Sequence, residues 1–540
     1  MQRFIPFIFL LLVSLPGFSQ VKLLGRTPAE TKKKSYVHLL HTDRTRFDSA
    51  FDPEAWILVG NVRFRRDSMY MYCDSAHYYQ KRNSFQAFGN VRMEQGDTLF
   101  LYGDNLDFDG VANYAKVRNN VRLIDKNTIL ETDSLDYDRN NNLGYFFEYG
   151  VLRDETSSLK SYYGDYNTVT KVAVFKDDVT LENPKFLLLS DTLRYNTKTN
   201  IATIVGPTNI YSGNNEVYSE HGHYNTSTRQ ARLVDRSTLY NGYRTFTADS
   251  MFYDSGNGFS EGFGNIVFSD TVNRNLLTGE YAFIDEVKDS AYVTRRALAI
   301  DYSQRDSVFV HSDTIWAVSY NVDTDSVYRL VKAYNKVRAW GKSLQAVCDS
   351  LVYDSRDSCM TMYKDPILWN GNTQLLGEVV KVYLKDSAID WVNVINQTLY
   401  VEQLDSACFN QIKGQEMKYF FSEGELREMQ VIGSVEIVFY PIDSDSTFIG
   451  MNTTTAGKTN VYMKDKKVNK IVIPNESKGV FYPMDQRPVD KRFLENFAWF
   501  DFVRPLSKED VFNWRGKGVD MELKVVKKDK IPLPSLDRFK

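Results

Sequence analysis

The sequence has little proline, little cysteine and no excess of charge of either sign. Its 540 residues include only 14 Pro and 4 Cys, and 66 Lys and Arg face 69 Asp and Glu, a formal net charge of -3. Without a basic excess to neutralise a phosphate backbone, we expect no nucleic-acid partner. Four scattered cysteines are too few to form a disulfide framework for so long a chain. The fold must therefore be stabilised by a hydrophobic core. A Cys348–Cys359 disulfide across one hairpin and buried free thiols both remain open.

No apolar run long enough to span a membrane is present. The longest candidate lies in the first 19 residues, where Arg3 precedes the apolar run 4–13 and Gly17 and Ser19 stand before Gln20. This pattern is typical of a cleaved secretory signal. We therefore expect residues 1–19 to be removed and the mature protein to be soluble outside the cytoplasm.

Aromatic residues are abundant instead. The chain holds 34 Tyr and 34 Phe, and aromatics make up 14% of it. Aromatic residues favour strands, and with so little proline the turns must be made by Gly, Asn and Asp. The composition therefore favours an all-β fold.

A hexapeptide of the form D-x-L-x-Y-D recurs along the chain. Degenerate copies fill the gaps, starting at residues such as Asp43, Asp74, Glu280 and Asp313, so a period of about 30 residues covers almost the whole chain after the signal. The clearest copies are 104–109, 133–138, 191–196, 249–254 and 349–354.

A second motif accompanies the hexapeptide at a constant distance. It reads Gly-Asn or Asn-Asn followed by alternating apolar and polar residues, and it lies 15 residues after the start of a hexapeptide in the pairs 74 and 89, 104 and 119, and 249 and 264. Its copies are 60–64, 89–93, 119–123 and 264–268. Alternation with period two predicts half-buried strands, and the Gly-Asn pair predicts a tight turn or a bulge.

These repeats predict an elongated stack of strands that share one interior. A parallel β-helix with one rung per repeat is one candidate. An antiparallel sheet folded lengthwise is the other, and tight turns and a single wet face favour it. With two strands per repeat at about 4.8 Å per strand, such a sheet would reach on the order of 100 Å.

The alternation of G-N-V-x-F with A-D-x-L-x-Y-D behind a signal sequence resembles the OstA/LptA family of periplasmic lipopolysaccharide-transport proteins. The best matches are 59–64, 88–93, 248–254 and 263–268, and the stretches 450–452, 461–463 and 470–472 resemble the end of such a domain. The resemblance covers roughly residues 36–475. It implies a β-jellyroll, or β-taco, in several fused copies, whose apolar trough carries the acyl chains of lipid A.

The resemblance also implies partners and a location. Lipopolysaccharide would be the ligand, other lipopolysaccharide-transport jellyrolls would stack on the edge strands, and the protein would lie in the periplasm, with association with the outer membrane left open. The organisation expected is a signal at 1–19, tandem jellyroll repeats at 20–475 and a cap or tail at 476–540.

The residues expected to line a lipid path share one strand face within the two motifs. For each of them, simple packing against the other interior side chains is the competing interpretation. They are Val62, Phe64, Val91, Met93, Leu106, Phe108, Val121, Leu123, Leu135, Tyr137, Leu193, Tyr195, Met251, Tyr253, Leu351 and Tyr353.

No catalytic group, metal site or cofactor is expected. His221 and His223 share a strand face, but no Cys or third His stands near them in sequence, so surface histidines are the preferred interpretation. The recurrent Asp133, Asp191 and Asp249 are expected to cap turns. A structural or adhesive β-solenoid of the cell envelope, with a dry interior, is the alternative function.

The segment from residue 480 onward loses the repeat and gains proline and a cluster of aromatics at 493–502. Ser507 with Asp510 three residues later resembles a helix start. We expect this segment to cover the last strand edge, with a partner-docking peptide as the alternative.

Overall fold

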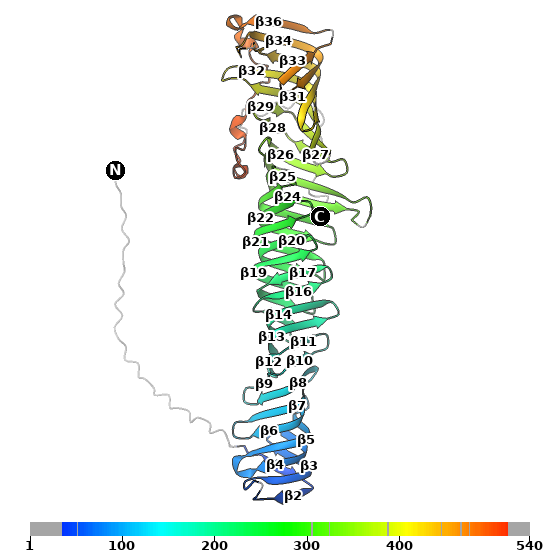
Figure 1. The fold of residues 1–540 in the computed structure, drawn as a ribbon, viewed down its shortest axis with the longest axis vertical. Coiled ribbons are helices and arrows are strands. Elements are labelled where there is room, and N and C mark those ends of the chain that lie inside the picture. Colours follow the sequence, from blue (N-terminus) through cyan, green and yellow to red (C-terminus); the bar gives the residue numbers. More distant parts are fainter. Residues whose placement is uncertain are drawn as a thin grey trace, which may run out of the picture.

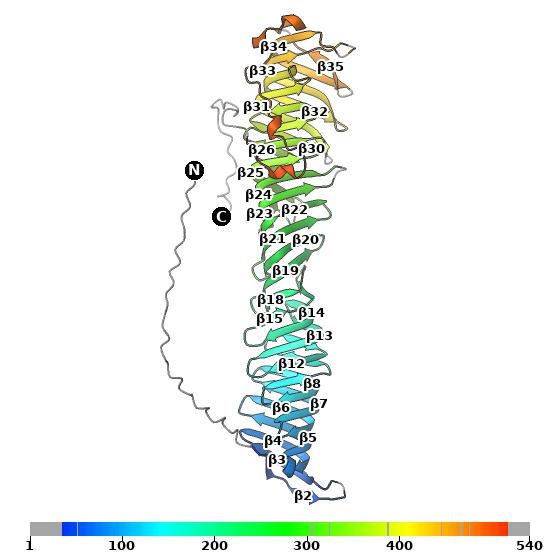
Figure 2. The ribbon, with the colours of Figure 1, turned by 90° about the vertical axis from the view of Figure 1, so that its left-hand side faces the viewer.

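The computed structural model describes residues 35–516, apart from residues 51, 304, 305, 323, 386, 387, 444, 446, 465, 466 and 475. The expected signal sequence lies outside these residues. The structure is 69% strand and 3% helix, so the prediction of an all-β fold is confirmed. The described strands form one sheet of 36 strands, drawn out into a long twisted column in which chain order follows the long axis (Figures 1 and 2).

The strands of the first half are mostly 11 or 12 residues long, with shorter pieces where a strand is interrupted. They are β1 (His38–His41), β2 (Arg44–Phe47), β3 (Trp56–Arg66), β4 (Met69–Tyr79), β5 (Ser84–Gln95), β6 (Leu99–Asp109), β7 (Tyr114–Asp125), β8 (Thr128–Asp138), β9 (Leu143–Phe146), β10 (Gly150–Arg153), β11 (Ser158–Ser161), β12 (Tyr163–Asn167), β13 (Val172–Asn183), β14 (Phe186–Asn196), β15 (Ile201–Ile204), β16 (Thr208–Ser212), β17 (Asn215–Ser219), β18 (His221–Asn225), β19 (Gln230–Asn241) and β20 (Arg244–Asp254).

The second half continues the same pattern and ends in short 3₁₀ turns. Its strands are β21 (Phe259–Asp270), β22 (Asn275–Asp285), β23 (Ser290–Asp301), β24 (Val308–Tyr320), β25 (Tyr328–Trp340), β26 (Gln345–Asp354), β27 (Cys359–Tyr363), β28 (Ile367–Asn370), β29 (Thr373–Leu376), β30 (Val379–Lys385), β31 (Ala388–Gln403), β32 (Phe409–Ser422), β33 (Glu425–Phe439), β34 (Gly450–Lys464), β35 (Lys467–Val472) and β36 (Lys478–Pro483). The 3₁₀ helices are η1 (Gln80–Arg82), η2 (Met484–Gln486), η3 (Val489–Lys491), η4 (Asp501–Val503) and η5 (Asp510–Phe512).

Every strand pairing in the described sheet is antiparallel, as between β5 and β6 or between β22 and β23. This excludes the parallel β-helix and is compatible with a β-jellyroll. A repeat contributes two long strands. Parallel neighbours would need long crossover connections, whereas the turns here are only a few residues long.

The Gly-Asn motif lies in the middle of a strand, where it forms a bulge. Gly89 and Asn90 have φ of 75° and 44°, and the register between β4 and β5 shifts there. Gly264 and Asn265 repeat the arrangement in β21, with φ of 73° and 44°. Such bulges bend a strand, and we call the line that they form along the sheet the crease.

The hexapeptide meets the Gly-Asn motif at the crease, which explains their constant spacing. The amide of Asn90 donates to the Asp74 carboxylate at 2.8 Å, and the amide of Asn265 donates to Asp249 at 2.6 Å. In the copies that begin at Asp74, Asp104 and Asp249, the first aspartate therefore stands 16 residues before the asparagine that it binds. A Cβ on Gly264 would come within 2.8 Å of the Asp249 carboxylate, so this position also needs glycine.

The expectation that these first aspartates cap turns is wrong. Asp133, Asp191 and Asp249 stand at the crease, in the middle of β8, β14 and β20. Turn capping falls to the last residue of the hexapeptide instead, because that residue ends the strand. Asp109 accepts the backbone N–H of Val111 at 2.8 Å. The corresponding last residues Asn167, Asn196, Asn225 and Asp254 accept in the same way.

The crease divides the sheet into two walls that face each other. Wall A runs from the crease to the hairpin turns at 67–68, 96–98, 126–127 and their successors, and we call this row of turns lip A. Wall B runs to the turns at 80–83, 110–113, 139–142 and their successors, which form lip B. At some levels a long strand is replaced by two short strands, one on each wall. For example, β15 pairs with the part of β14 that lies in wall B, and β16 pairs with the part that lies in wall A.

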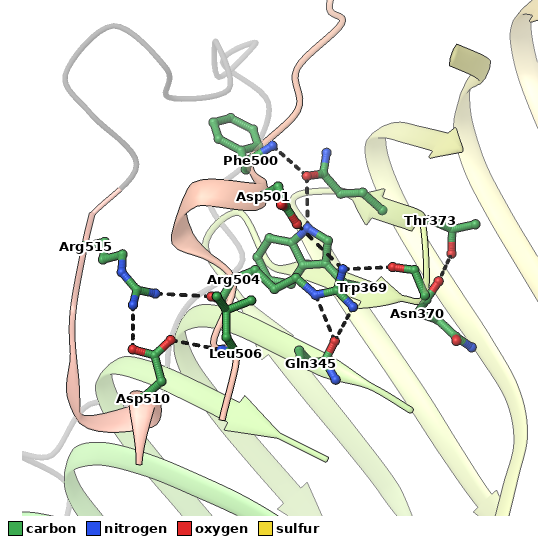
Figure 3. A network of polar contacts seen from close by, with 12 residues as sticks. Gln345, Trp369, Asn370, Thr373, Phe500, Asp501, Arg504, Leu506, Asp510 and Arg515 are labelled. Carbon is green, nitrogen blue, oxygen red and sulfur yellow. Dashed lines mark hydrogen bonds and ion pairs between the residues drawn. The ribbon is translucent and has the colours of Figure 1, made fainter. Parts of the chain in front are cut away.

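The first part of the C-terminal segment, β36, pairs along the edge of β34, and residues 484–516, which we call the strap, then return along the outer face of wall A. The side chains of Gln411, Gln374 and Gln345 bind it at successive levels of the column. Gln374, for example, accepts from the Phe500 backbone N–H at 2.7 Å and donates to the Ala498 carbonyl at 2.9 Å. Figure 3 shows the lower part of this contact, where Arg504 reaches Gln345 beside Trp369. The expected helix start at Ser507 is a single 3₁₀ turn, η5, with Ser507 accepting from the Asp510 N–H.

Candidate functional site

The residues predicted to line a lipid path do face the interior between the walls. Fifteen of the sixteen have side chains in the buried core, and Tyr353 is half-buried. Burial places them inside the column, but it does not distinguish contact with lipid from contact with each other. The contacts between the two walls divide the column into two sections.

In the first section, from β3 to β20, the two walls touch. The Phe64 ring on wall A stacks on Phe85 of wall B with 4.3 Å between centroids. Further along, Phe186 of wall A meets Tyr224 of wall B at 4.9 Å. Phe64, Phe85 and Tyr224 have no exposed surface. Interiors filled in this way leave no room for a guest, so we call this the closed section.

Polar bonds also hold the two lips together along the closed section. Arg66 donates to Asn113 at 3.0 Å, and Arg139 donates to Gln95 at 3.3 Å. The last bond of the series joins Asn215 of lip A to Glu286 of lip B at 3.0 Å. These bonds connect residues 44 to 71 positions apart in sequence and form a seam between the lips.

The tyrosine of the hexapeptide supplies part of this seam. Tyr166 donates to Asp125 at 2.9 Å, Tyr195 donates to Asp154 at 2.6 Å, and the Tyr253 hydroxyl accepts from Asn215 at 3.0 Å. Burial and then the hydrogen bond to Asp154 raise the pKa of Tyr195, so its hydroxyl keeps its proton. Tyr166, Tyr195 and Tyr253 thus each fill the interior with a ring and bond to the opposite lip through a hydroxyl group.

The second section, from β21 to β27, is open. At β21 Phe268 of wall A is partly exposed, while Ser260 of wall B is buried. From β22 to β25 the inward apolar side chains nearest the lips are partly exposed on both walls, and at β26 only Ala346 is buried. On wall A the strip runs through paired positions Phe268, Leu277, Ala299, Val310, Ala339 and Ala346. On wall B it runs through Ile284, Ala291, Ala317, Val331, Tyr353 and Met360.

The inner rows next to the crease stay sealed in the open section. Ala282, Val293, Ile315 and Ala333 pair in succession on wall B and are each 2% exposed. Among the described residues of this section, no hydrogen bond or ion pair joins the two lips. The open section is therefore a trough with a closed base and accessible upper walls. Its strips carry no ionisable side chain other than the phenol of Tyr353, so they can hold an apolar guest only through non-directional contacts.

A signal in the sequence marks the open section. In the hexapeptide copies that start at Glu280 and Asp313, the tyrosine position holds Ile284 and Ala317. Neither residue fills the interior as a tyrosine does, and neither can bond to the opposite lip. From the sequence alone, these copies are simply degenerate repeats. The predicted lining residues therefore include only Leu351 and Tyr353 from the open section.

The described residues also contain two cavities outside the trough. One, of about 570 Å³, lies at the N-terminal end of the column beside Trp56, Leu58 and Tyr78. The other, of about 550 Å³, lies in the seam and is lined by both lips, including Asn215, Arg229 and Glu286.

The structure gives the other candidate sites ordinary partners. His221 pairs with Asp235 at 2.9 Å, and His223 contacts the Thr203 hydroxyl at 3.2 Å. No group of three or more metal-ligating side chains occurs within the described ranges. Cys348 and Cys359 are both buried free thiols and stand opposite Val337 and Asp354 rather than each other. In the same residues, no helix is long and apolar enough to cross a membrane.

Fold and interior together define an elongated β-jellyroll with an apolar trough. Residues 34–191 match the family model described as OstA-like protein, so this part of the chain is similar to OstA-like proteins. The OstA-like family is associated with lipopolysaccharide and lipid transport in the periplasm and is a transport family rather than an enzyme family. No curated protein matches the chain. The matched residues belong to the closed section, and the open section follows them in the chain.

Proposed function

We propose that the protein binds the acyl chains of lipopolysaccharide, or of a related lipid, in its trough and helps to carry that lipid across the periplasm to the outer membrane. The observation that carries the proposal is the partial exposure of the inward apolar strips in the open section, such as Leu277, Val310 and Val331. Inward apolar surface left accessible by a folded protein is costly in water unless something covers it. Each methylene buried there would contribute about 0.8 kcal/mol.

The candidate residues differ in how directly they would contact a lipid in the trough. Tyr353 lies on the accessible strip of the open section and would contact lipid directly, whereas Leu351 lies in the buried inner row, opposite Ala333. The other candidates, such as Phe64, Phe108 and Tyr195, lie in the closed section, so lipid would reach them only if the seam parted. A structural β-solenoid with a dry interior would not need a section in which no bond joins the two lips and apolar side chains stay accessible.

The ends of the column suit the partners that we propose, other jellyrolls of the same transport system. β1 and β2 pair only with β3 among the described strands, which leaves their outer edge free. Leu40 and Phe47 of these strands are exposed. A partner strand added at this edge would complete its hydrogen bonds and extend the sheet from one protein to the next.

The test is site-specific photo-crosslinking in cells. A photoreactive side chain at Leu277 or Val310 should capture lipopolysaccharide, whereas the same group at Thr278 or Phe309, one residue away on the outer face and also partly exposed, should capture much less. Tyr195 reports on the closed section and should capture less than Leu277. Equal capture on both faces, or none on either, would contradict the proposed function.

A further inference from the structure

The cavity in the seam lies where the closed section gives way to the open section. Lip A contributes residues 184–185, 212–215 and 241, and lip B contributes Arg229, Tyr253, Ser255 and Glu286. The Asn215–Glu286 bond across it is the last that joins the lips. Glu286 follows Ile284, the first member of the accessible strip on wall B, by two residues. A polar cavity therefore directly adjoins the beginning of the apolar trough.

The cavity is a built polar site. Asn215 is 8% exposed, and its amide is fixed by the Tyr253 hydroxyl at 3.0 Å, while its oxygen accepts from Asn241 at 2.7 Å. Burial raises the pKa of Glu286, whose carboxyl group accepts a hydrogen bond from the Asn215 amide.

Two basic side chains that line the cavity make no polar contact with the rest of the described protein. Among the described residues, neither the Lys185 ammonium group nor the Arg229 guanidinium group has a hydrogen-bond or ion-pair partner. The buried hydroxyl of Tyr224, close enough to Arg229 for its charge to act on that phenol, also has none. Every other hexapeptide tyrosine from Tyr137 to Tyr253 has a hydrogen-bond partner. The regular seam is thus interrupted at the cavity, and donors are left unused there.

We propose that this cavity binds the phosphorylated, hydroxyl-bearing headgroup of the lipid whose acyl chains occupy the neighbouring open section. Lys185 and Arg229 bind the phosphate, and the asparagine amides and Ser255 bind hydroxyl groups. A guanidinium group and an ammonium group, one from each lip, suit a phosphate because charge-assisted hydrogen bonds to it are short and strong. The inference rests on the proposed lipid function and assigns the lipid an orientation, with its headgroup in the seam and its chains toward β22.

The experiment compares binding of lipid A with binding of the same lipid A after enzymatic removal of its phosphates. The purified full-length protein should bind the phosphorylated form more tightly, by about tenfold or more for two charge-assisted contacts. The double variant Lys185→Gln and Arg229→Gln should lose this preference and bind both forms like the dephosphorylated lipid. A matched control, Lys176→Gln with Arg232→Gln, removes the same charges from exposed outer positions and should keep the preference.

The outcomes separate this inference from the proposed function. If the native protein binds both lipids equally, or if the double variant keeps the phosphate preference, the proposed headgroup site is refuted. Neither result contradicts the proposed binding of acyl chains in the trough. If the native protein binds neither lipid, the lipid function itself fails. Circular dichroism of the variants, with the strand signal unchanged, ensures that lost binding is not lost folding.

Discussion

At the scale of single residues, tyrosine hydroxyl groups at three levels of the closed section help to hold the two lips together. Tyr195 is 1% exposed, and its hydroxyl group donates to Asp154 on the opposite lip. Tyr195→Phe would leave the ring in place and remove one donor to the Asp154 carboxylate, which also accepts from the Thr156 and Ser157 N–H groups. We expect the closed section to lose about 1 to 2 kcal/mol of local stability, measured as faster amide hydrogen exchange in β14 and β10.

Tyr224 provides the matched control for Tyr195. Its hydroxyl group is equally buried but has no hydrogen-bond partner, so Tyr224→Phe removes an unsatisfied polar group. That substitution should leave exchange unchanged or slow it. Equal effects of the two substitutions would show that packing of the rings, and not the bond across the seam, holds the lips together.

At the scale of elements, alternation in the hexapeptide was sufficient to predict which side chains face inward. Leu106 and Phe108, or Leu193 and Tyr195, are buried as expected because a strand has a strict period of two. The Gly-Asn pair was harder to place, since the same positive φ angles serve a hairpin turn and a bulge. The hydrogen bond from Asn90 to Asp74 on the neighbouring strand shows that the pair forms a bulge. The sequence of a single strand does not reveal which residues it pairs with, so this could not be predicted.

The strap is a second element whose path the sequence did not predict, because the face that it covers is formed by strands distant in sequence. Near its end, the Phe512 ring packs on His311 with 4.8 Å between centroids, and the Arg338 guanidinium group donates to the Val511 carbonyl. His311 is 6% exposed, and its ring binds the Ala297 carbonyl at 2.6 Å. Burial lowers the pKa of His311 below its usual value of 6.5.

This pKa makes the attachment of the strap depend on pH. A histidine whose pKa is lowered by burial takes up a proton more readily once it is uncovered, so docking should weaken as pH falls below about 6.5. Arg296 and Arg338 nearby oppose the proton, and Asp313 favours it. Amides of residues 510–514 should exchange faster at pH 5.5 than at pH 7.5, after correction for intrinsic rates. His311→Gln should abolish this difference, and its persistence would assign the effect to another group.

At the scale of the whole molecule, the column predicts a particle far longer than it is wide. A compact domain of this length would have a radius of gyration of about 24 Å. Two strands per repeat over residues 38–483 imply a column on the order of 140 Å at about 4.8 Å per strand, and therefore a radius of gyration of roughly 40 Å. Small-angle scattering measures this directly. A value near that of the compact domain would contradict the single extended sheet.

The elongated shape was predictable from the repeat, but its division into two sections was not. A period of about 30 residues predicts that each repeat stacks on the last, whether or not the interior is filled. The division depends on what stands at the tyrosine position, where Ile284 and Ala317 replace a ring and a hydroxyl group. Substitutions of this kind resemble ordinary drift in a degenerate repeat until the opposite lip is known.

The most direct test of an accessible, lipid-binding trough uses inward alanines from both sections. Ala173 and Ala231 lie in the closed section with no exposed surface, whereas Ala299 and Ala339 lie in the open section and are partly exposed. Each is replaced singly by cysteine, and the rate of labelling by a small maleimide is measured with and without lipid A. The native cysteines are buried, and burial raises the pKa of Cys73 to about 12, so background labelling should be slow. We predict rapid labelling at Ala299→Cys and Ala339→Cys that lipid A suppresses, and slow labelling at the other two. Equal rates at all four positions, or rapid labelling that lipid A leaves unchanged, would contradict the account.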